Sequence, residues 1–102
     1  MNTKIVNELV NERKRQDRLH GEYNSKLGAL STRRLNIIMG ELGEASQALD
    51  YVNRYLDSVS PEERDETFIT LKEAYRQEII SVAAFAVNIL EAMDSDSEYE
   101  SW

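Results

Sequence analysis

Apolar residues recur at spacings of three and four along most of this chain, a pattern typical of helices that bury one side. In the N-terminal segment the pattern is formed by Ile5, Val6, Leu9 and Val10, and Leu19 continues it. From Thr32 to about Asp57 the spacing predicts a second helix with one buried stripe, made of Leu35, Ile38, Leu42, Ala45, Leu49, Val52 and Leu56. The segment between the two helices, Gly21 to Ser31, is rich in turn-forming residues and is predicted to be a loop.

A third helix is predicted to begin at Pro61, since Ser60 suits its N-cap, proline suits the first helical position and Glu63 completes a capping box. No glycine or proline follows Pro61, so this helix is expected to run to about Met93. The β-branched segment Thr67 to Thr70 is the one place where a break is considered.

These segments predict an all-α fold, an antiparallel helical bundle formed by a single domain over residues 1–93, with an acidic flexible tail over residues 94–102. The third helix is apolar almost all round from Ile79 to Leu90. A lone three-helix unit could not cover such a helix, so a second copy of the chain is expected to complete the bundle, as a homodimer or homotetramer.

The chain has 102 residues, a formal net charge of −7, a sequence pI near 4.7 and no cysteine. A negative surface field argues against binding to nucleic acid or to an anionic membrane, and the lack of thiols excludes disulfide scaffolds and thiolate zinc sites. The N-terminal segment is charged and has no signal-peptide core, and no segment is apolar for long enough to span a membrane, so a cytoplasmic location is expected.

The candidate chemistry lies in three carboxylates. Glu41 and Glu44 are three residues apart on the second helix, which places both within reach of one cation. Glu78 begins the apolar run of the third helix, where Ser81 and Asn88 continue one narrow polar line. Three carboxylates converging inside a helical protein would hold a divalent cation. For Ser81 and Asn88, hydrogen bonding between helices remains an equal alternative to ligand contact, and on most helices an ExxE pair is only a solvated face.

Gly40 and Gly43 lie within the second predicted helix, where each costs about 1 kcal/mol relative to alanine. Close approach of a neighbouring backbone is the expected reason for both.

The segments "GELGEASQALD", "QEIISVAAFAVNILEA" and "NERKRQDRLHG" together resemble the MazG-like all-α nucleoside triphosphate pyrophosphohydrolases, in particular the short members that open with an ER-x-RQ segment. The resemblance covers the chain from about Glu12 to Met93. It implies a Mg²⁺-dependent enzyme, with Mn²⁺ as a substitute, that cleaves nucleotides between the α- and β-phosphates to release pyrophosphate and a nucleoside monophosphate.

The resemblance also implies roles for individual residues. Glu41 and Glu44 match the ExxE motif of the family and Glu78 matches the first acid of its ExxD motif, so these three glutamates are the expected metal ligands and catalytic residues. Asn88 matches a family asparagine ten positions beyond that acid. Ser81 departs from the pattern, because it stands where aspartate is usual, and this leaves the number of metal ions open.

Arg13, Arg15 and Gln16 belong to the ER-x-RQ segment, and they are candidates for contact with the phosphates or the base of a nucleotide substrate. A solvated helix face explains them equally well. The competing function is a non-catalytic helical interaction or effector-sensing protein that keeps the bundle and has lost turnover through Ser81.

Overall fold

The computed structural model describes residues 1–25 and 32–95, and it describes side chains for residues 1–19 and 32–94. Three long helices are present, α1 at Thr3–Ser25, α2 at Thr32–Ser58 and α3 at Glu66–Ser95, and a short 3₁₀ helix, η1, covers Pro61–Glu63. Within the two described ranges there is no strand. The predicted all-α class is therefore confirmed, and the predicted bounds of α2 agree with the structure to within one residue.

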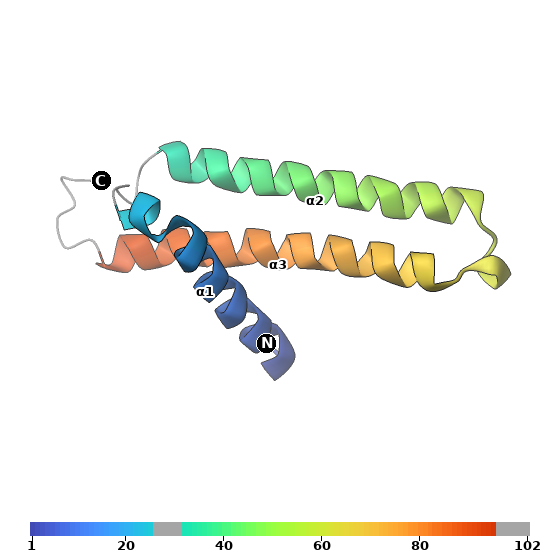
Figure 1. The fold of residues 1–102 in the computed structure, drawn as a ribbon, viewed down its shortest axis with the longest axis horizontal. Coiled ribbons are helices and arrows are strands. Elements are labelled where there is room, and N and C mark those ends of the chain that lie inside the picture. Colours follow the sequence, from blue (N-terminus) through green and yellow to red (C-terminus); the bar gives the residue numbers. More distant parts are fainter. Residues whose placement is uncertain (26–31, 96–102) are drawn as a thin grey trace.

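The helices are arranged around α3 (Figure 1). Helices α2 and α3 lie side by side and run in opposite directions, as predicted from the short connection between them. Helix α1 crosses the C-terminal half of α3 obliquely and packs on α3 far more than on α2. Helix α3 is thus covered by both α1 and α2. The α3 residues that face these two helices are the best shielded from water.

Helix α1 is longer than predicted. It is capped by Asn2, whose Oδ1 accepts a hydrogen bond of 2.8 Å from the backbone N–H of Ile5. It then continues through Gly21 to Ser25, so the predicted loop is wrong over residues 21–25. Glycine lowers helix propensity but keeps its backbone N–H, and one glycine therefore does not interrupt the hydrogen-bond ladder. The rest of the predicted loop, residues 26–31, lies outside the described residues.

The start of α3 also differs from the prediction. Ser60, Pro61 and Glu63 form only the single turn of η1, and Arg64 is extended, so that α3 begins at Glu66. Asp65 caps this helix, because its Oδ1 accepts the N–H of Thr67 at 3.0 Å. The break considered at residues 67–70 is not found, because these residues belong to the beginning of α3.

The aromatic contact at the turn explains this choice of cap. Tyr55 of α2 donates its hydroxyl to Asp65 Oδ1 at 2.8 Å, and its ring stacks on Phe68 with centroids 6.1 Å apart. Asp65 therefore joins the end of α2 to the start of α3, a contact between helices that the capping pattern at Ser60 does not reveal.

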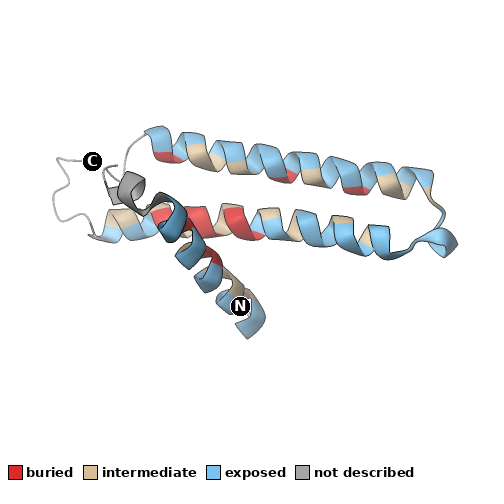
Figure 2. Cartoon of the chain, in the orientation of Figure 1, coloured by how far each residue is buried: buried red, intermediate tan, exposed pale blue. Residues whose placement is uncertain are grey.

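The core is small and lies on the facing sides of α2 and α3 (Figure 2). Its buried apolar residues are Ala45, Val52, Ile80, Ala84 and Phe85. On α3 the buried residues gather where α1 crosses. An equal number of buried residues are polar or charged, namely Glu12, Gln16, Arg34, Ser81 and Asn88. Buried polar groups need hydrogen-bond partners, and contacts between the helices supply them here, for example from Arg34 to Asn88 and from Ser81 to Glu12.

The predicted buried stripe of α2 is only partly buried. Leu35, Leu42 and Leu49, seven residues apart, are 58%, 50% and 38% exposed. The reason is that, within the described residues, α2 packs mainly on α3, so a line of residues rotated away from α3 stays open. Gly40 and Gly43 are exposed as well, and a Cβ added to either would meet nothing within 4 Å. The close neighbouring backbone expected at these glycines is not found within the described part of the chain.

Ile79 and Leu90 of α3 are also open, at 40% and 58% exposed. Asp94 and Ser95, predicted to belong to the tail, form the end of α3, and residues 96–102 are outside the described ranges. Among the helices described, none combines the length and the apolar character that crossing a bilayer requires.

Candidate metal centre

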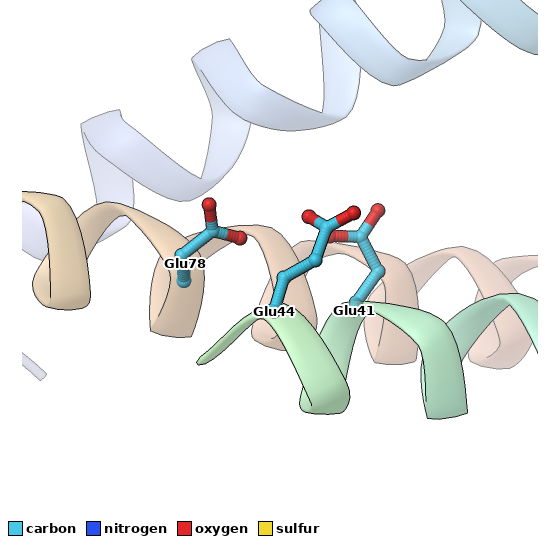
Figure 3. A group of neighbouring side chains, drawn as sticks. All are labelled: Glu41, Glu44 and Glu78. Atoms are coloured by element: carbon cyan, nitrogen blue, oxygen red, sulfur yellow. The ribbon is translucent and has the colours of Figure 1, made fainter. Parts of the chain in front are cut away.

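Three carboxylates meet where α2 and α3 run side by side (Figure 3). Glu41 and Glu44 stand one turn apart on α2, and Glu78 comes from the adjoining turn of α3 and faces the same side. One carboxylate oxygen from each residue lies within 4.8 Å of the other two. Antiparallel pairing of the two helices produces this convergence, because it brings residues 41–44 opposite the segment around residue 78.

The three carboxylates are held in a partly shielded place. Glu41 and Glu78 are half-buried and Glu44 is exposed, so the group opens to solvent on one side. Burial raises the pKa of Glu41, and the charges of Glu44, Glu78 and Glu12 raise it further. Burial is also the first cause of the raised pKa of Glu78, followed by the charge of Glu44. Excess negative charge in a shielded position is the electrostatic condition that a bound cation relieves.

The donor set fits a hard divalent cation. Mg²⁺ takes oxygen ligands at about 2.0–2.1 Å and keeps several waters, so neighbouring ligands lie about 3 Å apart and opposite ones about 4.2 Å apart. The glutamate oxygens, which lie within 4.8 Å of one another, would have to move closer together around the ion. Rotations about the side-chain bonds of glutamate are sufficient to close such a gap, and the half-exposed position leaves room for waters.

Another carboxylate, Glu12 of α1, lies beside Ser81 of α3 and outside the group of three. Glu12 is only 5% exposed, and four hydrogen bonds from described residues reach its two oxygens. Arg15 donates from Nε to Oε1 at 2.8 Å and from Nη2 to Oε2 at 2.9 Å. The Ser81 hydroxyl donates to Oε2 at 3.1 Å, and Gln16 Nε2 donates to the same oxygen at 3.4 Å. The hydrogen bond from Arg15 is the main cause of the lowered pKa of Glu12.

The prediction from sequence missed Glu12. A signal was present, because Glu8, Glu12 and Gln16 are four residues apart and therefore share one helix face. In the structure Ile5 and Leu9 of the predicted apolar stripe are half-buried, Val6 and Val10 are 38% and 46% exposed, and Glu12 and Gln16 are buried.

Arg15 of α1 interacts electrostatically with carboxylates of all three helices. Its pKa is raised, first by the hydrogen bond to Glu12 and, among weaker causes, by the charges of Glu41 and Glu78. The side chain is still 51% exposed, so its guanidinium lies at the open side of the group. Arg13 points elsewhere, because it pairs with Glu91 of α3 at 2.7 Å and with Asp17 at 3.1 Å.

Ser81 and Asn88 are both buried on α3, but they have different neighbours. Ser81 lies one turn after Glu78, and its backbone oxygen accepts a 3.1 Å hydrogen bond from Gln16 Nε2. Asn88 is ten residues beyond Glu78, or about 15 Å along the helix axis, and its Oδ1 accepts a 2.6 Å hydrogen bond from Arg34. The structure therefore brings Ser81 to the carboxylate region and leaves Asn88 in a separate polar contact between α2 and α3.

Comparison of the chain with known protein families, with curated proteins and with solved structures finds no match.

Proposed function

We propose that the chain is a Mg²⁺-dependent nucleotide pyrophosphohydrolase, which adds water across the bond between the α- and β-phosphates of a nucleoside or deoxynucleoside triphosphate. The products are a nucleoside monophosphate and pyrophosphate. One observation carries the proposal, the approach of Glu41, Glu44 and Glu78 to within 4.8 Å of one another. The resemblance of the same residues to the MazG-like motifs supports the choice of reaction.

In this proposal Glu41, Glu44 and Glu78 hold Mg²⁺, and one of them also orients the attacking water. A bound Mg²⁺, or Mn²⁺ in its place, polarises phosphate oxygens and lowers the pKa of water. Arg15 is well placed to contact a phosphate, because its half-exposed guanidinium adjoins the carboxylates. A roughly neutral combination of cation, arginine and carboxylates would accept an anionic triphosphate that the carboxylates alone would repel.

We also propose that the protein works as a homodimer or homotetramer. Leu35, Met39, Leu42, Ile69 and Leu90 are each at least half exposed in the single chain. A chain with so small a core is marginally stable by itself, and a second copy of its own helices would cover these residues.

The test is a panel of ribonucleotides and deoxyribonucleotides with and without Mg²⁺, in which monophosphate, pyrophosphate and orthophosphate are separated by chromatography. We expect pyrophosphate and monophosphate in equal amounts, and only with the metal. Glu41→Gln and Glu44→Gln should each abolish release with little change in helicity, while Glu62→Gln, a matched change in exposed η1, should leave the rate unchanged.

Folded protein that releases nothing from any nucleotide would refute the enzymatic proposal. Mg²⁺ binding without release would support the second candidate, a non-catalytic interaction or effector-sensing protein. The neutral Ser81 is the observation that favours that candidate, because a family acid is missing there.

A further inference from the structure

Helix α1 is docked on α3 mainly through polar side chains. It crosses α3 obliquely (Figure 1), and none of the buried apolar residues of the core belongs to its described part. The buried side chains of α1 are Glu12 and Gln16, whereas Ile5 and Leu9 are only half-buried. Apolar burial is the main favourable term in folding. It holds α2 against α3, and it contributes much less to the position of α1.

Two ion pairs between described residues join α1 to α3, and both are open to solvent. Glu8 pairs with Arg76, and their side chains are 26% and 34% exposed. Arg13 pairs with Glu91 at 2.7 Å, and the side chain of Glu91 is 59% exposed. Ion pairs at the surface contribute little to stability, and salt weakens them further because dissolved ions screen the charges. The two pairs orient α1 on α3 without holding it there firmly.

The buried polar groups of α1 would be well solvated if the helix moved away from α3. Gln16 Oε1 and Glu8 Oε1 are buried and have no hydrogen-bond partner among the described residues, and water would supply one to each. Glu12 would lose the hydroxyl of Ser81, but Arg15, which donates to both of its oxygens, lies on α1 as well and would move with it. Undocking therefore relieves two unsatisfied acceptors and leaves no charge buried without a partner.

The packing between the two helices is also incomplete. A cleft of about 290 Å³ remains between them, and Leu9, Val10 and Val87 form part of its lining. Apolar side chains that line a cleft make fewer contacts than side chains packed against a neighbour, so they gain less from docking. The cleft and the polar contacts are separate observations, and both indicate a weakly held helix.

We propose that α1 is a movable arm, which separates from α3 as one cooperative unit while α2 and α3 stay paired, with the docked form favoured at low ionic strength. Units of this kind open at a lower free energy than the rest of a protein when they have few buried apolar contacts. The arm does not depend on the proposed function, but its effect on substrate would. The three carboxylates stay together in both forms because they lie on α2 and α3, whereas Arg13, Arg15 and Gln16 are brought to α3 only when α1 is docked.

The experiment is native-state hydrogen exchange of the full chain, followed by NMR at single backbone amides. Amides 10–16 lie away from the N-terminus of α1, and their protection factors should be at least about tenfold lower than those of Val52 and Ala84. They should also share one dependence on urea, as a unit that opens together does. Raising NaCl from about 0.01 M to about 1 M shortens the Debye length from about 30 Å to about 3 Å, and it should lower the protection of α1 by about threefold or more.

Two matched variants separate the contact between helices from charge alone. Arg76→Gln removes the ion pair with Glu8, and it should lower the protection of amides 10–16 by about two- to fivefold. Arg54→Gln is the control, since Arg54 pairs at 2.9 Å with Asp50 of the same helix, α2, and should leave those amides unchanged. Both arginines are at least one-third exposed, so neither change disturbs the core.

Three results would overturn the inference: α1 protected as strongly as α2 and α3, protection that increases gradually from the N-terminus without a shared opening, or equal effects of the two arginine variants. The proposed function fails separately. If no nucleotide is hydrolysed and α1 opens as expected, the arm stands and only its effect on substrate is lost. If nucleotides are hydrolysed while α1 is as protected as the other helices, this inference alone fails.

Discussion

Glu41 allows the sharpest test of the metal centre, because one substitution should have opposite effects with and without the cation. Glu41→Gln keeps the size of the side chain and removes one negative charge from the group. Two unit charges 4.8 Å apart repel by about 0.9 kcal/mol in water and about 3.5 kcal/mol at an effective dielectric constant of 20. Glu44 is exposed and Arg15 offsets part of the repulsion, so a gain of about 1 kcal/mol is expected.

The assay is thermal unfolding followed by circular dichroism at low ionic strength and fixed protein concentration, first with a chelator and then with Mg²⁺. A gain of about 1 kcal/mol corresponds to a rise in Tm of about 4–8 °C for a domain of this size. Added Mg²⁺ at 100 times its Kd stabilises a folded protein that binds it by about 2.7 kcal/mol. The original protein should show this second rise, and Glu41→Gln should lose most of it.

Glu62→Gln is the control, because it makes the same change in η1, away from the three carboxylates. Glu62→Gln should change neither the Tm with the chelator nor the Tm with Mg²⁺ by more than about one or two degrees. A lower Tm for metal-free Glu41→Gln would mean that Glu41 belongs to a satisfied structural network. An equal Mg²⁺ response in both proteins would mean that Glu41 does not bind the cation, and either result would refute the reasoning.

Three further predictions follow from the same contacts. The pKa values of Glu41 and Glu78 are raised above 4.5 in the folded chain, so their contribution to metal-free stability is present at low pH and is lost as pH rises through the folded pKa values. Mg²⁺ competes with those protons, so the Mg²⁺ affinity measured by calorimetry should increase as pH rises through the folded pKa values. Proton release should appear as a binding enthalpy that depends on the buffer, and an affinity that stays constant with pH would contradict the prediction. Asn88→Ala removes the 2.6 Å hydrogen bond from buried Arg34, and it should lower the free energy of unfolding in urea by about 1–3 kcal/mol; a raised KM at unchanged stability would instead favour substrate contact. Met39→Glu places a charge on an apolar side chain that is 64% exposed, and analytical ultracentrifugation should show a shift from oligomer toward monomer, whereas an originally monomeric protein would refute the proposed assembly.

Much of the three-carboxylate group could be predicted from the sequence because its geometry is local. Glu41 and Glu44 are close on any helix that contains both, since a spacing of three always brings side chains to neighbouring positions. Glu78 required one further step, the antiparallel packing of α2 on α3, which the short connection between them favours. The convergence of these residues in the structure therefore follows from helix geometry and one topological rule.

Glu12 was not predictable in the same way. Ile5 and Leu9 of the predicted apolar stripe are half-buried, and they share their face of α1 with Glu12 and Gln16, whereas Val6 and Val10 are rotated away and exposed. General burial energetics argue against a carboxylate on that face, since an unpaired buried carboxylate is costly. Glu12 is nevertheless buried there, because Arg15 and Ser81 satisfy it.

The sequence by itself thus determined the helical class, the extent of α2 and the pairing of Glu41 with Glu44, because periodicity and propensity act over three or four residues. Only the tertiary structure decided which face of α1 lies against α3, that Leu35 and Leu42 remain open, and that Asp65 begins α3. The physical reason is that helical spacing places Ile5 and Leu9 between Val6 on one side and Glu12 on the other, and it does not decide which of these neighbours turns inward. That choice depends on the crossing of the helices and on partners distant in sequence, such as Tyr55 for Asp65 and Ser81 for Glu12.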